Sequence, residues 1–146
     1  MSTPLFDHNR VILCHFDSYS TALVFARYGA SILAPAPLPA SAAPMPAPAP
    51  AEVAVHHEPE MVFDALAAQF GLDPAKLNPD DDFEAWMASD DGPIRIHLVR
   101  FATLDAPKEA IEPIGGVFKP ISEMRGMPMI ELNLMRQVFN QIMGGG

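Results

Sequence analysis

The segment PAPLPASAAPMPAPAPAE, residues 35–52, constrains the fold of this chain more than any other stretch. Seven of its eighteen residues are proline, and almost nothing in it could pack in a core, yet hydrophobic sequence lies on both sides. Nearly alternating Pro and Ala favour an extended polyproline conformation that rises about 3.1 Å per residue. We therefore predict three parts: an N-terminal strand-helix docking segment over residues 1–34, a Pro/Ala-rich extended linker over 35–52 and a C-terminal domain over 53–146.

The composition is that of a folded, acidic protein. The 146 residues suffice for one ordinary domain, or for a smaller domain with attachments. Apolar residues make up 49% of the chain and charged residues 18%, far from the range typical of disorder. The net charge is -9 and the nine Lys and Arg are scattered, so we expect neither nucleic acid nor an anionic membrane as a partner.

The cellular compartment is predicted from the cysteine and the hydrophobic segments. Cys14 is the single cysteine, which excludes an internal disulfide framework and is typical of a reducing compartment. The longest apolar neighbourhood, residues 11–34, is interrupted by Asp17 and Arg27, so it fails as a membrane span. We therefore expect a cytoplasmic protein without membrane insertion.

The N-terminal segment is predicted to contain one strand and one helix. Residues 11–16, VILCHF, are rich in branched and aromatic side chains and predict a short strand. Residues 21–33, TALVFARYGASIL, predict a helix with apolar residues around much of its circumference. A piece below about 40 residues cannot normally bury so much apolar surface alone. The segment must therefore lie on something else.

Helices dominate the prediction for the C-terminal part. Pro59 suits a first helical position and Gly71 a helix end, which predicts a helix over residues 59–70. Pro128 begins a second helix, in which two neighbouring rows of apolar side chains face polar residues on the opposite side. The acids at 80–82 suit the start of a further short helix.

The same part contains one clear strand signal. Residues 94–104, IRIHLVRFATL, alternate over their first half, with Ile96 on one side and Arg95 and His97 on the other. A single strand is improbable, so either residues 117–119 or VILCHF should pair with it. We therefore predict an α+β fold in which the C-terminal domain is small and mostly helical and has a short sheet.

No metal or cofactor site is predicted. Two of the five histidines, His56 and His57, are adjacent and would point about 100° apart in a helix or 180° apart in a strand. The set His8, Cys14 and His15 lacks the repeated ligand spacing of a zinc site. Cys14 lies within an apolar run, where we expect a small buried thiol.

The three-part organisation suggests a non-catalytic accessory or adaptor subunit. In this interpretation the two ends of the chain bind separate places on a larger protein assembly, or on a second copy of the protein, and the linker makes the second contact intramolecular. The candidate contact residues are Leu23, Val24 and Tyr28 near the N-terminus and Arg125 and Met127 near the C-terminus.

An alternative interpretation remains open. The N-terminal segment could fold back and add VILCHF to the sheet beside residues 94–104, giving one self-contained domain. A pocket near Arg95, His97 and Arg100 could then bind a small anionic ligand or support catalysis, so whether the chain is an enzyme stays undecided.

Overall fold

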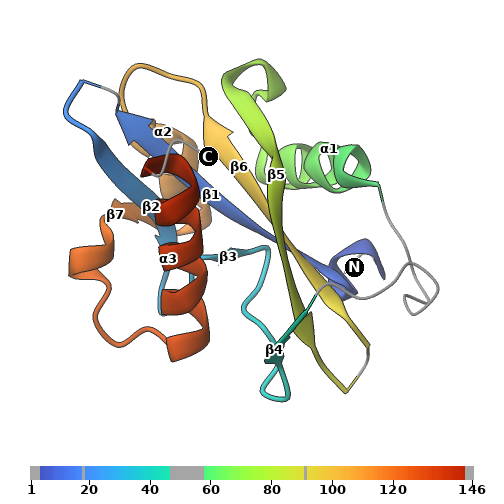
Figure 1. Cartoon of the computed structure of the whole chain (residues 1–146). Coiled ribbons are helices and arrows are strands. Elements are labelled where there is room, and N and C mark those ends of the chain that lie inside the picture. The colour runs from blue at the N-terminus through green and yellow to red at the C-terminus, as the bar shows by residue number, and fades with distance from the viewer. Residues whose placement is uncertain (1–3, 18, 47–57, 91, 144–146) are drawn as a thin grey trace.

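A computed structural model describes residues 4–17, 19–46, 58–90 and 92–143 (Figure 1). Its core is a mixed seven-stranded sheet with helices on both faces. Helix α3 (Met129–Met143) covers one face, and α1 (Pro59–Phe70) and α2 (Lys108–Ile111) cover the other. We call these the α3 face and the α1 face.

The strands come from distant parts of the chain. Along the sheet the order is β4 (Ala43–Met45), β5 (Leu77–Ala88), β6 (Ile94–Phe101), β1 (Asn9–Asp17), β2 (Ala22–Tyr28) and β7 (Gly116–Lys119), and β3 (Leu33–Ala34) also pairs with β1. Strands β1 and β6 are parallel, and every other pair is antiparallel. Short 3-10 helices occur at Pro4–Asp7 (η1), Pro74–Lys76 (η3), Glu112–Ile114 (η4) and Ile121–Glu123 (η5).

Strand β1 lies in the middle of the sheet because both of its faces are apolar. Its first seven residues are buried. Ile12 and Cys14 belong to the core under α3, whereas Val11 and Leu13 belong to the core under α1. A continuous apolar run is the expected pattern for a strand that has helices on both sides.

Several predicted elements are confirmed. VILCHF lies within β1, residues 59–70 form α1, residues 117–119 lie within β7, and the helix after Pro128 is α3. The strand predicted over residues 94–104 is β6, which ends at Phe101. Helix α1 ends at Gly71, whose φ of 67° is in the left-handed region that glycine adopts without strain. Ile94, Ile96 and Leu98 face α3, which agrees with the predicted alternation of β6.

The predicted fold class was wrong, because the molecule is built on a large mixed sheet and is not mostly helical. The predicted helix over residues 21–33 is instead β2 and β3. A short apolar run cannot be assigned to helix or strand from periodicity alone, and here β1 and β7 supply the pairing that makes it a strand. Branched and aromatic residues such as Val24, Phe25 and Tyr28 favour the same outcome.

The short helix predicted near residues 80–86 was also wrong, since these residues belong to β5. Phe83, Ala85 and Met87 alternate and all enter the core under α3. The pairing register of β5 with β6 shifts between Asp80 and Ala85, so the acids lie in an irregular part of a strand. Acids suit a helix start, but here Asp80 is held within the strand by its contacts with Gln141 and Arg100.

The described part of the Pro/Ala-rich segment, residues 35–46, runs along the surface of the protein. Leu38 and Ala42 pack against the core under α3, and residues 43–45 form β4, which pairs with β5. Residues 47–52 lie outside the described residues. Both predicted end segments therefore contribute strands to one sheet, as the alternative interpretation requires, since β1 pairs directly with β6.

The described helices are short or carry polar side chains along their length. None of them is both long and apolar enough to cross a lipid bilayer.

Candidate functional site

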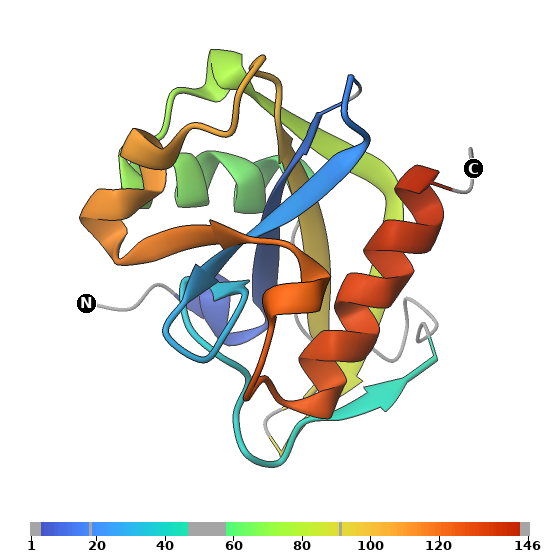
Figure 2. The ribbon, with the colours of Figure 1, turned by 90° about the vertical axis from the view of Figure 1, so that its left-hand side faces the viewer.

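Strand β7 forms one edge of the sheet. It pairs with β2 on one side, and no strand among the described residues pairs with its other side. Figure 2 faces this edge and shows β7 leading through η5 to α3. An edge strand presents backbone N–H and C=O groups that can pair with another chain. Val117 is 50% exposed at its centre, so the edge is open to solvent.

An apolar groove lies next to β7 on the α3 face. It is formed by the start of β2, the residues that follow β7 and the C-terminal half of α3, and its volume is about 600 Å³. Its lining includes Leu23, Ile121, Phe139 and Met143, and Phe139 is 42% exposed. We call it the α3 groove.

The α3 groove exists because α3 has more apolar surface than the sheet covers. Leu134, Met135 and Val138 are fully buried against the sheet. Phe139 and Met143 follow Met135 at helical spacing and line the groove beside η5, where Phe139 is exposed and Met143 is partly buried. The apolar row of Met135, Phe139 and Met143 is therefore fully buried at Met135 and partly open to solvent from Phe139 onward.

A smaller depression opens beside β7 on the α1 face. It lies between α2 and β7, has a volume of about 230 Å³ and includes Lys108, Ile111, Phe118 and Lys119 in its lining. We call it the α2 pocket. Helix α2 packs closely on the start of β7, since a Cβ at Gly116 would lie 3.0 Å from the Cβ of Ile111.

The two depressions open on opposite faces of the sheet. Ile111 and Phe118 pack with the core under α1, whereas Leu23 and Ile121 pack with the core under α3. Successive side chains of an extended strand also point to opposite faces. A segment paired with β7 could therefore direct alternate side chains toward the α2 pocket and the α3 groove.

The charges around β7 differ in sign from the chain as a whole. The charged residues that line the two depressions are Lys108, Lys119 and Arg136, which are basic, and Glu112, which is acidic. Lys119 lies 3.8 Å from Glu123, but both side chains are largely exposed, so this ion pair contributes little. A basic rim on a chain of net charge -9 favours an acidic binding partner.

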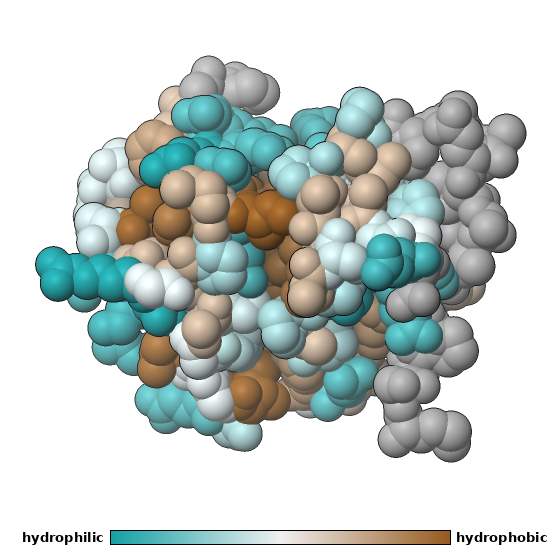
Figure 3. Space-filling view, turned by 90° about the horizontal axis from the view of Figure 1, so that it is seen from below, coloured by the Kyte–Doolittle hydropathy of each residue, from teal (hydrophilic) through white to brown (hydrophobic). Residues whose placement is uncertain are grey.

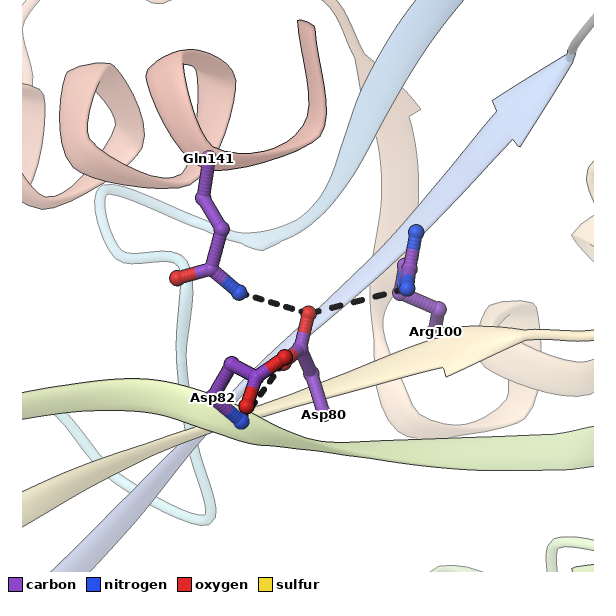
Figure 4. Close-up of polar contacts among 4 residues, drawn as sticks. All are labelled: Asp80, Asp82, Arg100 and Gln141. Carbon is purple, nitrogen blue, oxygen red and sulfur yellow. Dashed lines mark hydrogen bonds and ion pairs between the residues drawn. The ribbon is translucent and has the colours of Figure 1, made fainter. Parts of the chain in front are cut away.

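A polar cluster lies elsewhere on the α3 face, below the end of α3 (Figure 4). Asp80 Oδ2 accepts a hydrogen bond from Gln141 Nε2 at 2.7 Å and lies 3.6 Å from Arg100 Nη2, and Asp80 Oδ1 accepts from the backbone N–H of Asp82 at 3.0 Å. The side chain of Asp80 is only 7% exposed. The cluster thus ties the irregular part of β5 to β6 and α3.

Cys14 lies beside this cluster and is not arranged as a nucleophile. The residue is fully buried, as predicted, and burial raises the pKa of its thiol to about 12; Arg100 opposes this shift and Asp80 adds to it. A thiol with such a pKa stays protonated at neutral pH, whereas the thiolate is the reactive form.

Arg95, His97 and Arg100 do not converge on one pocket. Arg95 and His97 line a cavity of about 20 Å³ near the start of α1, and Arg100 is absent from its lining and contacts Asp80 on the α3 face. This space suits a water molecule at most. His97 is buried with its Nε2 2.8 Å from Asn9 Oδ1, and burial, followed by the charge of Arg95, lowers its pKa to about 3.

The five predicted contact residues are not gathered on one surface either. Leu23 and Met127 are buried at 6% and 7% exposure, although Leu23 also lines the α3 groove. The ring of Tyr28 packs on Phe70 with their centroids 6.2 Å apart.

The remaining two of those residues are more accessible. Val24 is partly buried in β2, and Arg125 is exposed, with its carbonyl oxygen accepting a hydrogen bond from Arg27 Nη2 at 3.0 Å.

Val117, Ile121 and Phe139 were not selected from the sequence as candidate contact residues. Phe139 could have been identified from the sequence, because α3 carries two adjacent rows of apolar side chains and packing on one sheet face buries only part of such a wide apolar surface.

The described residues contain no group of three or more His, Cys, Asp or Glu side chains that could hold a metal ion. His56 and His57 lie outside the described residues. Cys14 and His15 point to opposite faces of the sheet, as adjacent strand residues do: Cys14 joins the α3 core, and His15 Nε2 lies 2.8 Å from Thr103 O.

Comparison with known proteins does not assign a family. The chain matches no protein-family model and no curated protein.

Proposed function

We propose that this chain is a protein-binding module that pairs an extended segment of a partner protein with the free edge of β7. The observation that carries the proposal is the combination of an open strand edge with a depression on each face of the sheet beside it, an apolar groove on one face and a pocket with charged residues on the other. Strand addition to a sheet edge is a recurring mode of peptide recognition, in which backbone hydrogen bonds supply affinity and pockets for alternate side chains supply specificity.

The lining of the site defines the partner segment. Apolar side chains on one face of the segment would fill the α3 groove against Ile121 and Phe139. An acidic side chain on its other face would lie near Lys108 and Lys119 of the α2 pocket. The proposed partner is thus an extended segment in which apolar and acidic residues alternate.

The proposal keeps the adaptor role but changes its geometry. Both ends of the chain contribute to a single surface, because β2 comes from the N-terminal segment and β7 and α3 come from the C-terminal part. The module would then act as an accessory subunit by holding one segment of a larger assembly. We place it in the cytoplasm, since its single cysteine, Cys14, is a buried free thiol.

Peptide selection tests this function. The full-length protein is used to select binders from a random peptide library displayed on phage, and the affinity of the selected peptide is measured by fluorescence anisotropy. We expect alternating apolar and acidic residues in the selected sequences. Phe139→Ala should weaken binding about tenfold, the size typical of an interface anchor.

Met61→Ala is the matched control. Met61 is also a large apolar residue, is 53% exposed and lies on α1, away from β7, so its truncation should leave the affinity unchanged. Equal affinities of Phe139→Ala and wild type, or selected peptides without a common pattern, would contradict the proposal. Dimers that Phe139→Ala disrupts would assign the surface to a second copy instead of a different partner.

A further inference from the structure

Another pocket lies at the end of the molecule where α3 begins, and no residue of β7 lines it. Three segments form it: the turn between β2 and β3, the proline-containing residues 37–42, and the first residues of α3. Its volume is about 460 Å³, within the range of small-molecule sites. Figure 3 views this end of the molecule and shows apolar surface at the bottom of a hollow. We call it the proline pocket.

The walls of the proline pocket are apolar and carry one charge. Leu38, Ala42 and Ile130 are among the lining residues, together with several prolines. Glu131 is the only Asp, Glu, Lys or Arg in the described lining, and it is 2% exposed. A largely apolar pocket with one or two polar groups is the usual composition of a ligand site.

Among the described residues, the hydrogen bonds to Glu131 leave part of its carboxylate unused. Glu131 Oε1 accepts from the backbone N–H of Ile32 at 2.7 Å, and Ser31 Oγ lies 3.1 Å from Oε1 and 2.9 Å from Oε2. The Ser31 hydroxyl has one hydrogen and can donate to one oxygen at a time, whereas a carboxylate offers about four acceptor positions. Glu131 can therefore accept further hydrogen bonds from a molecule in the pocket.

The charge of Glu131 is also left without a direct counter-ion. Burial, the largest cause, raises the pKa of this carboxyl, and its hydrogen bonds with Ile32 and Ser31 and the charge of Arg27 partly oppose the shift. The Arg27 guanidinium donates to the carbonyl oxygens of Gly29 and Arg125 and does not line the pocket. In the described part of the chain, no basic group lies within ion-pair distance of Glu131.

Tyr28 does not supply the missing partner. Tyr28 is among the residues that line the pocket, and its buried phenol oxygen has no hydrogen-bond partner among the described residues, but its ring packs on Phe70 on the α1 face. The buried carboxylate is therefore the polar group with which this pocket can recognise a ligand.

We propose that the proline pocket binds a small molecule with an apolar body and a protonated amine, which donates hydrogen bonds to Glu131. The apolar body fills the space between Leu38 and Ile130, and the ammonium group supplies the charge that compensates the buried carboxylate. The proline pocket shares no lining residue with the α3 groove or the α2 pocket, so the proposal does not rest on the proposed protein-binding role.

Three probes of similar shape test the proposed chemistry. Benzylamine, benzyl alcohol and benzoate are titrated into the full-length protein, and binding is followed by isothermal titration calorimetry and by chemical shifts of the pocket residues. Benzylamine should bind at concentrations up to about 10 mM, benzyl alcohol should bind more weakly and benzoate should not bind. No binding of benzylamine in this range, or binding of benzoate with equal affinity, would overturn the proposal.

Glu131→Gln tests the residue that the proposal names. The substitution keeps the shape of the side chain and removes its charge, and it should weaken benzylamine binding by at least about tenfold. Glu109→Gln is the matched control, because Glu109 is an exposed glutamate on α2. It should leave the affinity unchanged. Unchanged benzylamine affinity in Glu131→Gln would contradict the proposal.

Ala40→Trp tests the site without altering Glu131. Ala40 is exposed and lines the pocket, so an indole at this position should obstruct it while the fold is kept. Benzylamine binding should be lost, and this variant decides the question if circular dichroism shows that Glu131→Gln is unfolded. Full benzylamine binding to a folded Ala40→Trp protein would place the amine site elsewhere and overturn the proposal.

Discussion

The centre and the edge of the sheet differ in how much of their surface is available to bind another molecule. In the centre, β1 is paired on both sides and its first seven residues are buried. At the edge, β7 is paired on one side, Val117 is half exposed, and a depression lies on each face. Substitutions in the centre should therefore change stability and leave binding intact, whereas substitutions at the edge should do the reverse.

The largest effect is expected from Ile12→Ala in β1. Ile12 is fully buried in the core under α3, so its truncation leaves a cavity between the sheet and α3. We expect a loss of about 2–5 kcal/mol in the free energy of unfolding, measured by urea denaturation. Under conditions where the variant is folded, it should bind the selected peptide as wild type does. A loss below about 1 kcal/mol would show that the centre is not the rigid part of the molecule.

The second effect is acid destabilisation through His97. Its pKa is about 3 in the folded protein and 6.5 in the unfolded chain, so protons bind the unfolded state first as the pH falls. The stability contribution of neutral His97 is therefore present above pH 6.5 and is lost as the pH falls toward 3. The slope is at most about 1.4 kcal/mol per pH unit.

His97→Gln separates this effect from general acid unfolding, since the amide retains hydrogen-bonding groups for Asn9 but does not titrate. Urea denaturation between pH 7 and pH 4 should show a smaller loss of stability in the variant than in wild type. Parallel curves would mean that His97 is not the titrating group.

A third, opposite pH dependence is expected from Glu131. Its folded pKa is raised, so the folded state holds the proton more tightly than the unfolded chain, whose pKa is near 4.5. The contribution of this group is fully present below pH 4.5 and is lost as the pH rises through the folded pKa. Subtracting the pH curve of Glu131→Gln from that of wild type should leave a component that falls with rising pH. A rising component would contradict the raised pKa.

A helix or strand could be predicted from the sequence where residues within the element itself determine its conformation. Helix α1 was predictable because Pro59 and Gly71 mark its ends, and β6 was predictable because its side chains alternate. Strands β2 and β5 were not, since their conformation depends on β1, β6 and β7, which are distant in the sequence. The local signals were ambiguous for residues 21–33 and misleading for the acids at 80–82.

The candidate sites were less predictable than the fold. The sequence predicts that residues 117–119 are extended, but β7 is an edge only because of the order of the other strands. Glu131 occupies the first turn of α3, where an acid is ordinary, and its burial results from the contact with Ser31 and Ile32 about one hundred residues away in sequence. Neither the edge position of β7 nor the burial of Glu131 can be predicted from the residues that neighbour them in the sequence.

The smallest effect on stability is expected at the edge. Phe139→Ala removes a side chain that is 42% exposed, so the free energy of unfolding should fall by less than about 1 kcal/mol. The same substitution should weaken peptide binding about tenfold. Thermal unfolding measures the change in stability, and fluorescence anisotropy on the same sample measures the change in peptide affinity. A large loss of stability with unchanged peptide affinity would remove the distinction between centre and edge.

The most direct test of the central claim is amide hydrogen exchange with and without the selected peptide. Pairing of an extended segment with β7 gives hydrogen-bond partners to its outward backbone groups. We predict that amides within Gly116–Lys119 gain protection when the peptide is bound, while those of α1 are unchanged. Protection confined to other elements, with exchange in β7 unaltered, would contradict the account.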